Sequence, residues 1–172
     1  MSSQHDISRL SKEVTLKHNI AFARLSEIEP SEIVAHMSDP RIREHMPLLT
    51  FEWSVEVVER FIVQKEDYWA RDGLGHWAFL SNGHYVGWGG FQKEEDGWDF
   101  GLVLRPGAFG LGIHISRKAL EFAVADERIP FVTFLLPPSR KNVGALQRLG
   151  ARFVNEIEYD GVHFLQFRLE TK

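Results

Sequence analysis

The chain of 172 residues contains no cysteine. Disulfides, thiolate nucleophiles and cysteine-ligated metal sites are therefore excluded. It also lacks a long apolar run, because no stretch is long enough to cross a bilayer and no N-terminal segment resembles a signal peptide. These absences lead us to expect a cytoplasmic protein with no membrane partner.

Neither sign of charge dominates the sequence. Twenty Lys and Arg residues stand against 24 Asp and Glu residues, for a net charge of −4. This balance provides no general attraction to nucleic acid, so we expect no nucleic-acid partner. The eight histidines are scattered without the spacing of a metal site, and we expect no metal.

The composition is that of a globular protein, with 44% hydrophobic and 26% charged residues. The length suits one domain with a substantial core, and we find no internal repeat or long linker. We therefore expect a single domain over residues 1–172, with residues 1–12 as a polar, loosely held N-terminal segment. Sequence alone leaves monomer and homodimer open.

Hydrophobic periodicity predicts alternating groups of strands and helices in the order β, αα, βββ, α, β, α, ββ. Asn-Gly at 82–83 and Asp-Gly at 96–97 and 160–161 are typical hairpin turns. Predicted strands cover residues 14–16, 20–25, 77–80, 85–92, 98–104, 131–136, 153–159 and 162–169. Predicted helices cover residues 30–37, 41–46, 55–72, 112–123 and 139–149. This pattern indicates a mixed α/β fold that is mostly antiparallel before residue 105.

Three glycines, at 107, 110 and 112, separate the strand that ends at Leu104 from a helix pattern. Strand, glycine turn and helix can present bare backbone N–H groups to a phosphate. The glycine offsets of 0, 3 and 5 match neither a dinucleotide fingerprint nor a P-loop. On spacing alone, a turn that merely joins strand to helix is an equal alternative.

The run Phe109-Gly110-Leu111-Gly112 resembles the pyrophosphate loop of the GNAT superfamily of acetyltransferases, although Gly107 stands where Gln or Arg is usual. Residues 99–106, Asp-Phe-Gly-Leu-Val-Leu-Arg-Pro, resemble the strand before that loop. Residues 139–153 resemble the family's final motif, with the usual Asn and Ser/Ala positions exchanged. The order and character of these motifs are similar to those of the ribosomal-protein N-terminal acetyltransferase branch.

This resemblance implies a twisted, mostly antiparallel sheet of about six to seven strands with helices on both faces. It also implies acetyl-CoA as the cofactor, held by strand backbone, glycine turn and final motif. Arg105 or Arg140 would add charge near the phosphates. The implied cofactor-binding residues are Leu102, Val103, Leu104, Arg105, Gly107, Phe109, Gly110, Leu111, Gly112, Ile113, Ser139 and Asn142.

Acetyl transfer to an amine requires a base, and Asp99 is the candidate because it occupies the acidic position of the motif strand. The alternative is a strand-face Asp that holds a backbone or lysine partner. Glu94 and Glu95 are expected to be solvated charges in a hairpin turn. Many relatives carry a tyrosine that protonates the leaving thiolate, but Leu146 stands at that position here.

The early helices and the loops over the sheet usually select the acceptor in this superfamily. Here they contain Arg41 and His45, which can attract a carboxylate, and Trp88, which can line the cleft. A solvated helix face and core packing are the alternatives. The sequence thus predicts direct acetyl transfer to a primary amine of a peptide, a protein N-terminus or a small molecule. The alternative function is a non-catalytic acyl-CoA-binding sensor or partner module.

Overall fold

The structure is a computed structural model that describes residues 19–46, 48–49, 51–140 and 143–172. The predicted strand at 14–16 and Asn142 lie outside these residues. The strands are β1 (Ile20–Arg24), β2 (His76–Ser81), β3 (His84–Lys93), β4 (Trp98–Leu104), β5 (Phe131–Leu136), β6 (Arg152–Tyr159) and β7 (Val162–Glu170). The α-helices are α2 (Pro30–Met37), α3 (Pro40–Arg43), α4 (Val55–Asp72), α5 (Gly112–Ala125) and α6 (Gly144–Arg148), and η1 (Leu25–Glu27) and η2 (Pro106–Leu111) are 3-10 helices.

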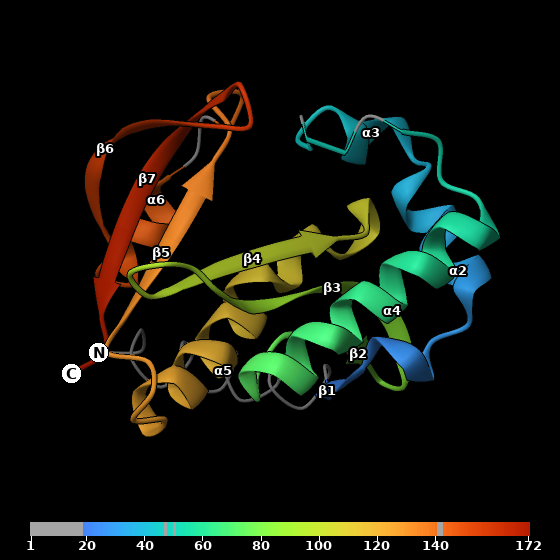
Figure 1. Cartoon of the computed structure of the whole chain (residues 1–172), viewed down its shortest axis with the longest axis horizontal. Coiled ribbons are helices and arrows are strands. Elements are labelled where there is room, and N and C mark those ends of the chain that lie inside the picture. The colour runs from blue at the N-terminus through green and yellow to red at the C-terminus, as the bar shows by residue number, and fades with distance from the viewer. Residues whose placement is uncertain (1–18, 47, 50, 141–142) are drawn as a thin grey trace, which may run out of the picture.

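The seven strands form one mixed sheet in the order β1-β2-β3-β4-β5-β7-β6 (Figure 1). Every neighbouring pair is antiparallel except β4 and β5, which run parallel. The parallel pair follows from the chain path, since η2 and α5 cross over between β4 and β5. The predicted fold class, a mostly antiparallel mixed sheet with helices, is confirmed.

Strand periodicity divides the sheet into two buried faces. In β2, Trp77 and Phe79 belong to one core cluster and Ala78, between them, to the other. The first cluster packs the sheet against α5 and includes Phe91, Trp98, Phe100, Ile115, Ala119 and Ala123. The second packs it against α2 and α4 and includes Ile33, Met37, Val58, Tyr85 and Trp88. Helices therefore cover both faces, as the sequence predicts.

Local signals set the boundaries of α4. Ser54 accepts a hydrogen bond from the Val57 N–H at the first turn, and Gly73 ends the helix in the left-handed conformation with φ of 72°. None of the helices in the described ranges is long and apolar enough to cross a membrane.

The predicted helix over residues 139–149 is wrong at its start. The observed α6 begins only at Gly144. Residues 137–140 form a turn instead, in which the Arg140 N–H donates to the carbonyl of Pro137. Pro137 and Pro138 favour extended backbone for residues 136 and 137, and the chain then turns through residues 137–140 rather than starting a helix at residue 139.

Candidate functional site

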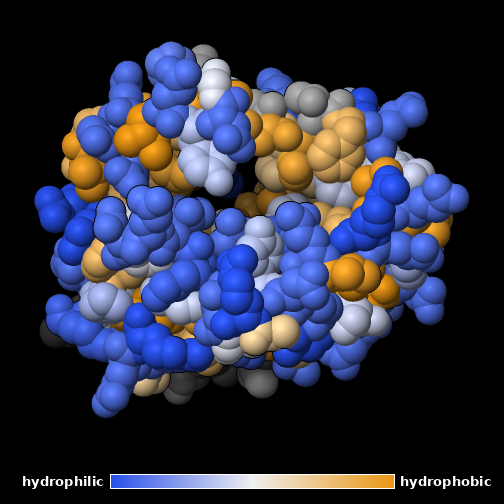
Figure 2. All heavy atoms as spheres, in the orientation of Figure 1, coloured by the Kyte–Doolittle hydropathy of each residue, from blue (hydrophilic) through white to orange (hydrophobic). Residues whose placement is uncertain are grey.

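The strands β4 and β5 pair only at their beginnings. Their register contains two residue pairs, Trp98 with Val132 and Asp99 with Thr133. On its other edge, β4 pairs with β3 along its whole length. The two parallel strands therefore diverge after Asp99, and β4 beyond this fork has no strand on its β5 side (Figure 1). Figure 2 shows a hollow between the lobe of β6 and β7 and the lobe that carries α3.

Asp99 lies at the fork. Its Oδ1 accepts a hydrogen bond of 3.0 Å from the Thr133 hydroxyl, in the last residue pair before the strands part. Burial raises the pKa of Asp99 to about 7, while the Thr133 bond opposes the rise and the charge of Glu94 adds to it. A half-buried carboxylate with this pKa exchanges a proton near neutrality, as a general base must.

Two residues near Asp99 have no motif that would reveal them. Tyr159, at the end of β6, lies close enough to Glu94 and Asp99 for their charges to raise its pKa. Tyr68, on α4, contributes to the same shift. Sequence analysis missed both tyrosines because they come from elements far from Asp99 along the chain.

The glycine turn forms the 3-10 helix η2, which runs directly into α5. Nothing lies within 4 Å of the position that a Cβ would occupy at Gly107 or Gly110. At Gly112 such a Cβ would meet the side chains of Leu102 and Leu104 at 3.8 and 3.6 Å. The start of α5 therefore rests on β4, while the turn beside it is open.

Backbone amides of this turn are engaged within it. The Ala108 N–H donates to the Arg105 carbonyl at 2.8 Å, and the Gly112 N–H donates to the Phe109 carbonyl. A phosphate bound by these amides would have to replace bonds of this type, which are weaker in a 3-10 helix than in an α-helix. Phe109, with 53% of its surface exposed, offers an apolar ring beside the turn.

Arg105 is directed toward α2. Its Nη2 donates to the Glu32 carbonyl at 2.9 Å, and its Nη1 donates to the Tyr85 carbonyl at 3.3 Å. The guanidinium carbon lies 5.0 Å from the centroid of the Tyr85 ring. Arg105 thus connects the end of β4 to α2, and its guanidinium is not directed toward η2.

A buried hydrogen bond joins the same elements. The His36 Nδ1 and the Tyr85 hydroxyl are 2.7 Å apart, and burial lowers the pKa of His36 to about 4. The imidazole is therefore neutral at pH 7, and its Nε2 has no hydrogen-bond partner among the residues described.

Replacing Tyr85 with phenylalanine leaves both nitrogens of His36 unpaired. We expect Tyr85→Phe to lower the free energy of unfolding at pH 7 by about 1–3 kcal/mol, as measured by urea denaturation. Tyr159→Phe is the control, because that hydroxyl lies at an exposed strand end. Equal stability of Tyr85→Phe and wild type would contradict a structural role for the bond.

The three residues predicted to bind the acceptor, Arg41, His45 and Trp88, lie in three different environments. His45, after α3, approaches Ser139, with its Nδ1 3.4 Å from the Ser139 hydroxyl, and so brings together the early helices and the loop after β5. Arg41 is exposed and forms an ion pair with Asp39 at 2.8 Å. Trp88 is buried, and its indole Nε1 faces the Met37 sulfur at 3.3 Å, so it lies under α2 and α4.

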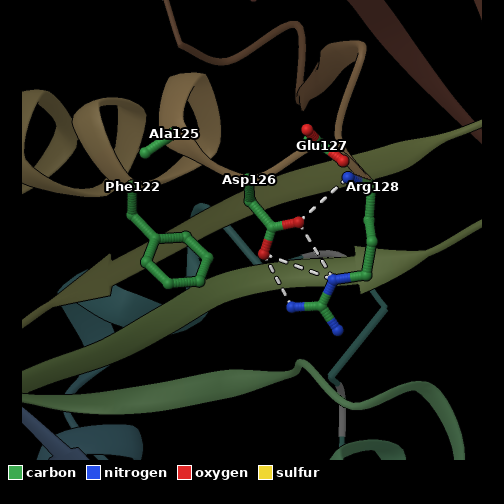
Figure 3. Close-up of a pocket in the computed structure, with 5 residues that line it drawn as sticks. All are labelled: Phe122, Ala125, Asp126, Glu127 and Arg128. Carbon is green, nitrogen blue, oxygen red and sulfur yellow. Dashed lines mark hydrogen bonds and ion pairs between the residues drawn. The ribbon is translucent and has the colours of Figure 1, made fainter.

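A separate shallow hollow lies at the far end of α5 and is lined by Phe122, Ala125, Asp126, Glu127 and Arg128 (Figure 3). The carboxylate of Asp126 accepts from the Arg128 guanidinium at 2.7 Å and from the Arg128 N–H at 2.9 Å. The charges of Asp126 and Arg128 in this hollow therefore neutralise each other, and the hollow offers no group of polar side chains that points toward a common ligand position.

Comparison with solved structures identifies the class of fold. A GNAT-family acetyltransferase from Bacillus anthracis superposes with a TM-score of 0.70 at 12% identity, over 90% of this chain and 95% of the other. The Campylobacter jejuni N-acetyltransferase PseH in complex with acetyl coenzyme A gives 0.65 at 15% identity, over 90% and 100%. The aminoglycoside acetyltransferase AAC(6')-Ib in complex with coenzyme A gives 0.67 at 12%, over 89% and 94%.

The chain therefore has the GNAT acetyltransferase fold, as its glycine motif and strand order predict. No protein-family model matches the sequence. At these identities the likeness establishes the fold, and the chemistry must be argued from this chain's own residues.

Proposed function

We propose that the protein is an acetyl-CoA-dependent N-acetyltransferase that acts on a primary amine. The observation that most supports this proposal is the position of Asp99, a half-buried carboxylate at the fork where β4 and β5 part. The acceptor would be an amine of a peptide, a protein N-terminus or a small molecule. Two of the solved structures with this fold contain coenzyme A or acetyl coenzyme A, which supports the choice of cofactor.

The residues around the fork fit such a cofactor. Beyond Asp99 the β5 side of β4 carries no strand partner, so backbone groups of residues 102–104 on that side are available to amides of an extended pantetheine arm. The open surface at Gly107 and Gly110 lets a pyrophosphate approach the backbone at the start of α5, where the helix dipole favours an anion. Ser139 lies on the loop after β5, beyond the end of one of the two strands that diverge.

Asp99 supplies the base. When bound, acetyl-CoA supplies an acetyl thioester that a neutral amine can attack. Asp99 removes a proton from the ammonium form of the acceptor, directly or through one water, and Thr133 holds the carboxylate in place. Because the pKa of Asp99 is about 7, the group is ionised in a large fraction of molecules at neutral pH.

Cofactor binding is tested by closing the open surface at Gly110. We expect calorimetry to detect acetyl-CoA binding to the wild type and Gly110→Val to weaken it at least about tenfold, because the side chain occupies the phosphate approach. The fold should survive, since nothing lies within 4 Å of the new Cβ.

Ala125→Val, an exposed position at the other end of α5, is the matched control and should bind acetyl-CoA like the wild type. Unchanged affinity in a folded Gly110→Val protein would place the cofactor elsewhere. Absence of binding to the wild type at millimolar acetyl-CoA would refute the proposed function. Binding without acetylation of any amine would favour a non-catalytic acyl-CoA-binding module.

A further inference from the structure

Lys65 places an ammonium group above the sheet face that α2 and α4 cover. Its Nζ lies 5.2 Å from the centroid of the Trp88 ring, 5.4 Å from that of Phe61 and 5.6 Å from that of Tyr68. In the part of the chain that the structure describes, its ammonium makes no ion pair or hydrogen bond. Ring faces thus hold this cation without a counter-ion.

His76 lies beside Lys65 and is also incompletely satisfied. Its ring centroid is 5.6 Å from that of Trp88, the residue is 8% exposed, and its buried Nδ1 has no hydrogen-bond partner among the described residues. Burial and the charge of Lys65 hold the pKa of His76 well below its usual range, so the ring is neutral. A neutral imidazole in this position can donate one hydrogen bond to an anion.

The strand register connects His76, and with it the neighbouring Lys65, to the strand that carries Asp99. His76 on β2 pairs with Gly90 on β3, and Gly90 pairs with Gly101 on β4. Nothing lies within 4 Å of the position that a Cβ of Gly101 would occupy, whereas a Cβ at Gly90 would meet the Gly75 carbonyl oxygen and the Trp77 ring at 2.8 Å. Asp99 is two residues from Gly101 and therefore shares its face of the strand. The face of β4 at Gly101 is thus open beside the Asp99 carboxylate, and the unpaired cation lies on the same side of the sheet, across β3.

We propose that the space over this face is the acceptor pocket and that Lys65, together with His76, binds a carboxylate of the acceptor amine. The inference rests on the proposed function and narrows its substrate class to small molecules that carry both an amine and a carboxylate. The acceptor's amine lies toward Asp99, and its carboxylate lies toward β2. Two strand spacings separate β4 from β2, so the two ends are up to roughly 10 Å apart.

Charge balance favours a carboxylate over a phosphate. The pocket offers one cation and one neutral donor, which together match a monoanion. A phosphate dianion would leave an uncompensated negative charge in a desolvated place, at considerable cost. Burial lowers the pKa of Lys65 to about 8, and a carboxylate would supply the counter-ion that the ammonium lacks.

The test compares acids with their amides as probes. Calorimetry in the presence of coenzyme A would measure binding of β-alanine, γ-aminobutyrate, δ-aminovalerate and ε-aminocaproate, each beside its primary amide. For at least one pair we expect the acid to bind about 10- to 100-fold more tightly than the amide, because it makes a charged hydrogen bond to Lys65. In Lys65→Met this preference should disappear.

Lys93→Met is the matched control, because the Lys93 Nζ also lies over an indole, 5.0 Å from the centroid of Trp98, but this ring belongs to the core on the α5 side. It should keep the full preference. Equal binding of acid and amide, a preference that persists in Lys65→Met, or no binding of any acid at millimolar concentration would each overturn the inference.

Turnover separates this inference from the proposed function. If acid and amide are acetylated with equal kcat/KM, the enzyme is an acetyltransferase and the carboxylate pocket is refuted. If the acid binds through Lys65 but no amine is ever acetylated, the pocket is supported and the proposed catalysis fails. If the acid is acetylated with a higher kcat/KM and Lys65→Met abolishes the difference, both are supported.

Discussion

Asp99→Asn is expected to lower kcat for acetyl transfer about 100-fold or more, the usual contribution of a general base. The amide keeps the size of the side chain and still accepts the hydrogen bond from Thr133, so fold and cofactor affinity should be unchanged. The assay is release of free CoA thiol at saturating acetyl-CoA and amine. Asp126→Asn, at the C-cap of α5 and in an ion pair with Arg128, is the matched control and should turn over like the wild type.

The pH dependence of kcat/KM gives a second test of Asp99 as the base. Because the pKa of Asp99 is about 7, kcat/KM should fall about tenfold per pH unit below that value and level off above it. Thr133→Val removes the bond that favours the ionised form, so it should move this limb to higher pH while the plateau stays. Wild-type turnover of Asp99→Asn across the profile would remove Asp99 from the mechanism.

Ionisation of Asp99 as the pH rises should lower the stability of the fold while it raises activity. The pKa of Asp99 is raised from 3.8 in the unfolded chain to about 7 in the folded protein, so the folded state holds the proton more tightly. The free energy of unfolding therefore decreases as the pH rises from about 4 to about 7. Asp99→Asn should be more stable than the wild type at about pH 8 and equally stable near pH 4. Greater stability of the wild type at the higher pH would contradict a desolvated carboxylate.

Gly89→Ala is expected to destabilise the protein by about 3 kcal/mol or more, or to prevent folding. A Cβ at Gly89 would lie 2.2 Å from the Gly101 carbonyl oxygen and 2.9 Å from the Leu102 Cα. Both are backbone atoms of β4, so relief requires that β3 and β4 separate next to the fork. Urea denaturation monitored by tryptophan fluorescence measures the loss.

Gly101→Ala is the matched control for this clash. The same substitution on the facing strand meets nothing within 4 Å, so its stability should lie within about 1 kcal/mol of the wild type. Because it projects into the proposed acceptor pocket, it should raise KM for the amine. Equal stability of the two alanine variants would show that β3 and β4 do not approach as closely as the structure has them.

Much of the fold follows from signals that act within a few residues. Alternating side chains predict the strands, and Asn-Gly or Asp-Gly predicts each hairpin turn. Ser54 and Gly73 delimit α4 because a cap bonds only to its own helix turn. The predicted helix over residues 139–149 begins too early, because apolar spacing does not reveal that the chain makes a turn after β5 before α6 starts at Gly144.

Side chains that meet across elements were harder to foresee. Asp99 was predicted from its motif, but the half-burial that raises its pKa depends on β5 and on the hairpin that carries Glu94. Arg105 was predicted to lie near phosphates, whereas its guanidinium is turned to carbonyls of α2 and β3. Lys65 had no sequence signal, since a lysine in an amphipathic helix ordinarily faces solvent.

The sequence by itself determined the elements of this protein, their order and the glycine run before α5. Those features depend on backbone preferences and hydrophobic spacing, which are local. Only the tertiary structure decided where β4 and β5 part, and that His76 on β2 aligns with Gly101 on β4 across β3. Such relations depend on strand register and on helix packing, which bring together residues far apart in the chain, such as Asp99 and Thr133, 34 positions apart.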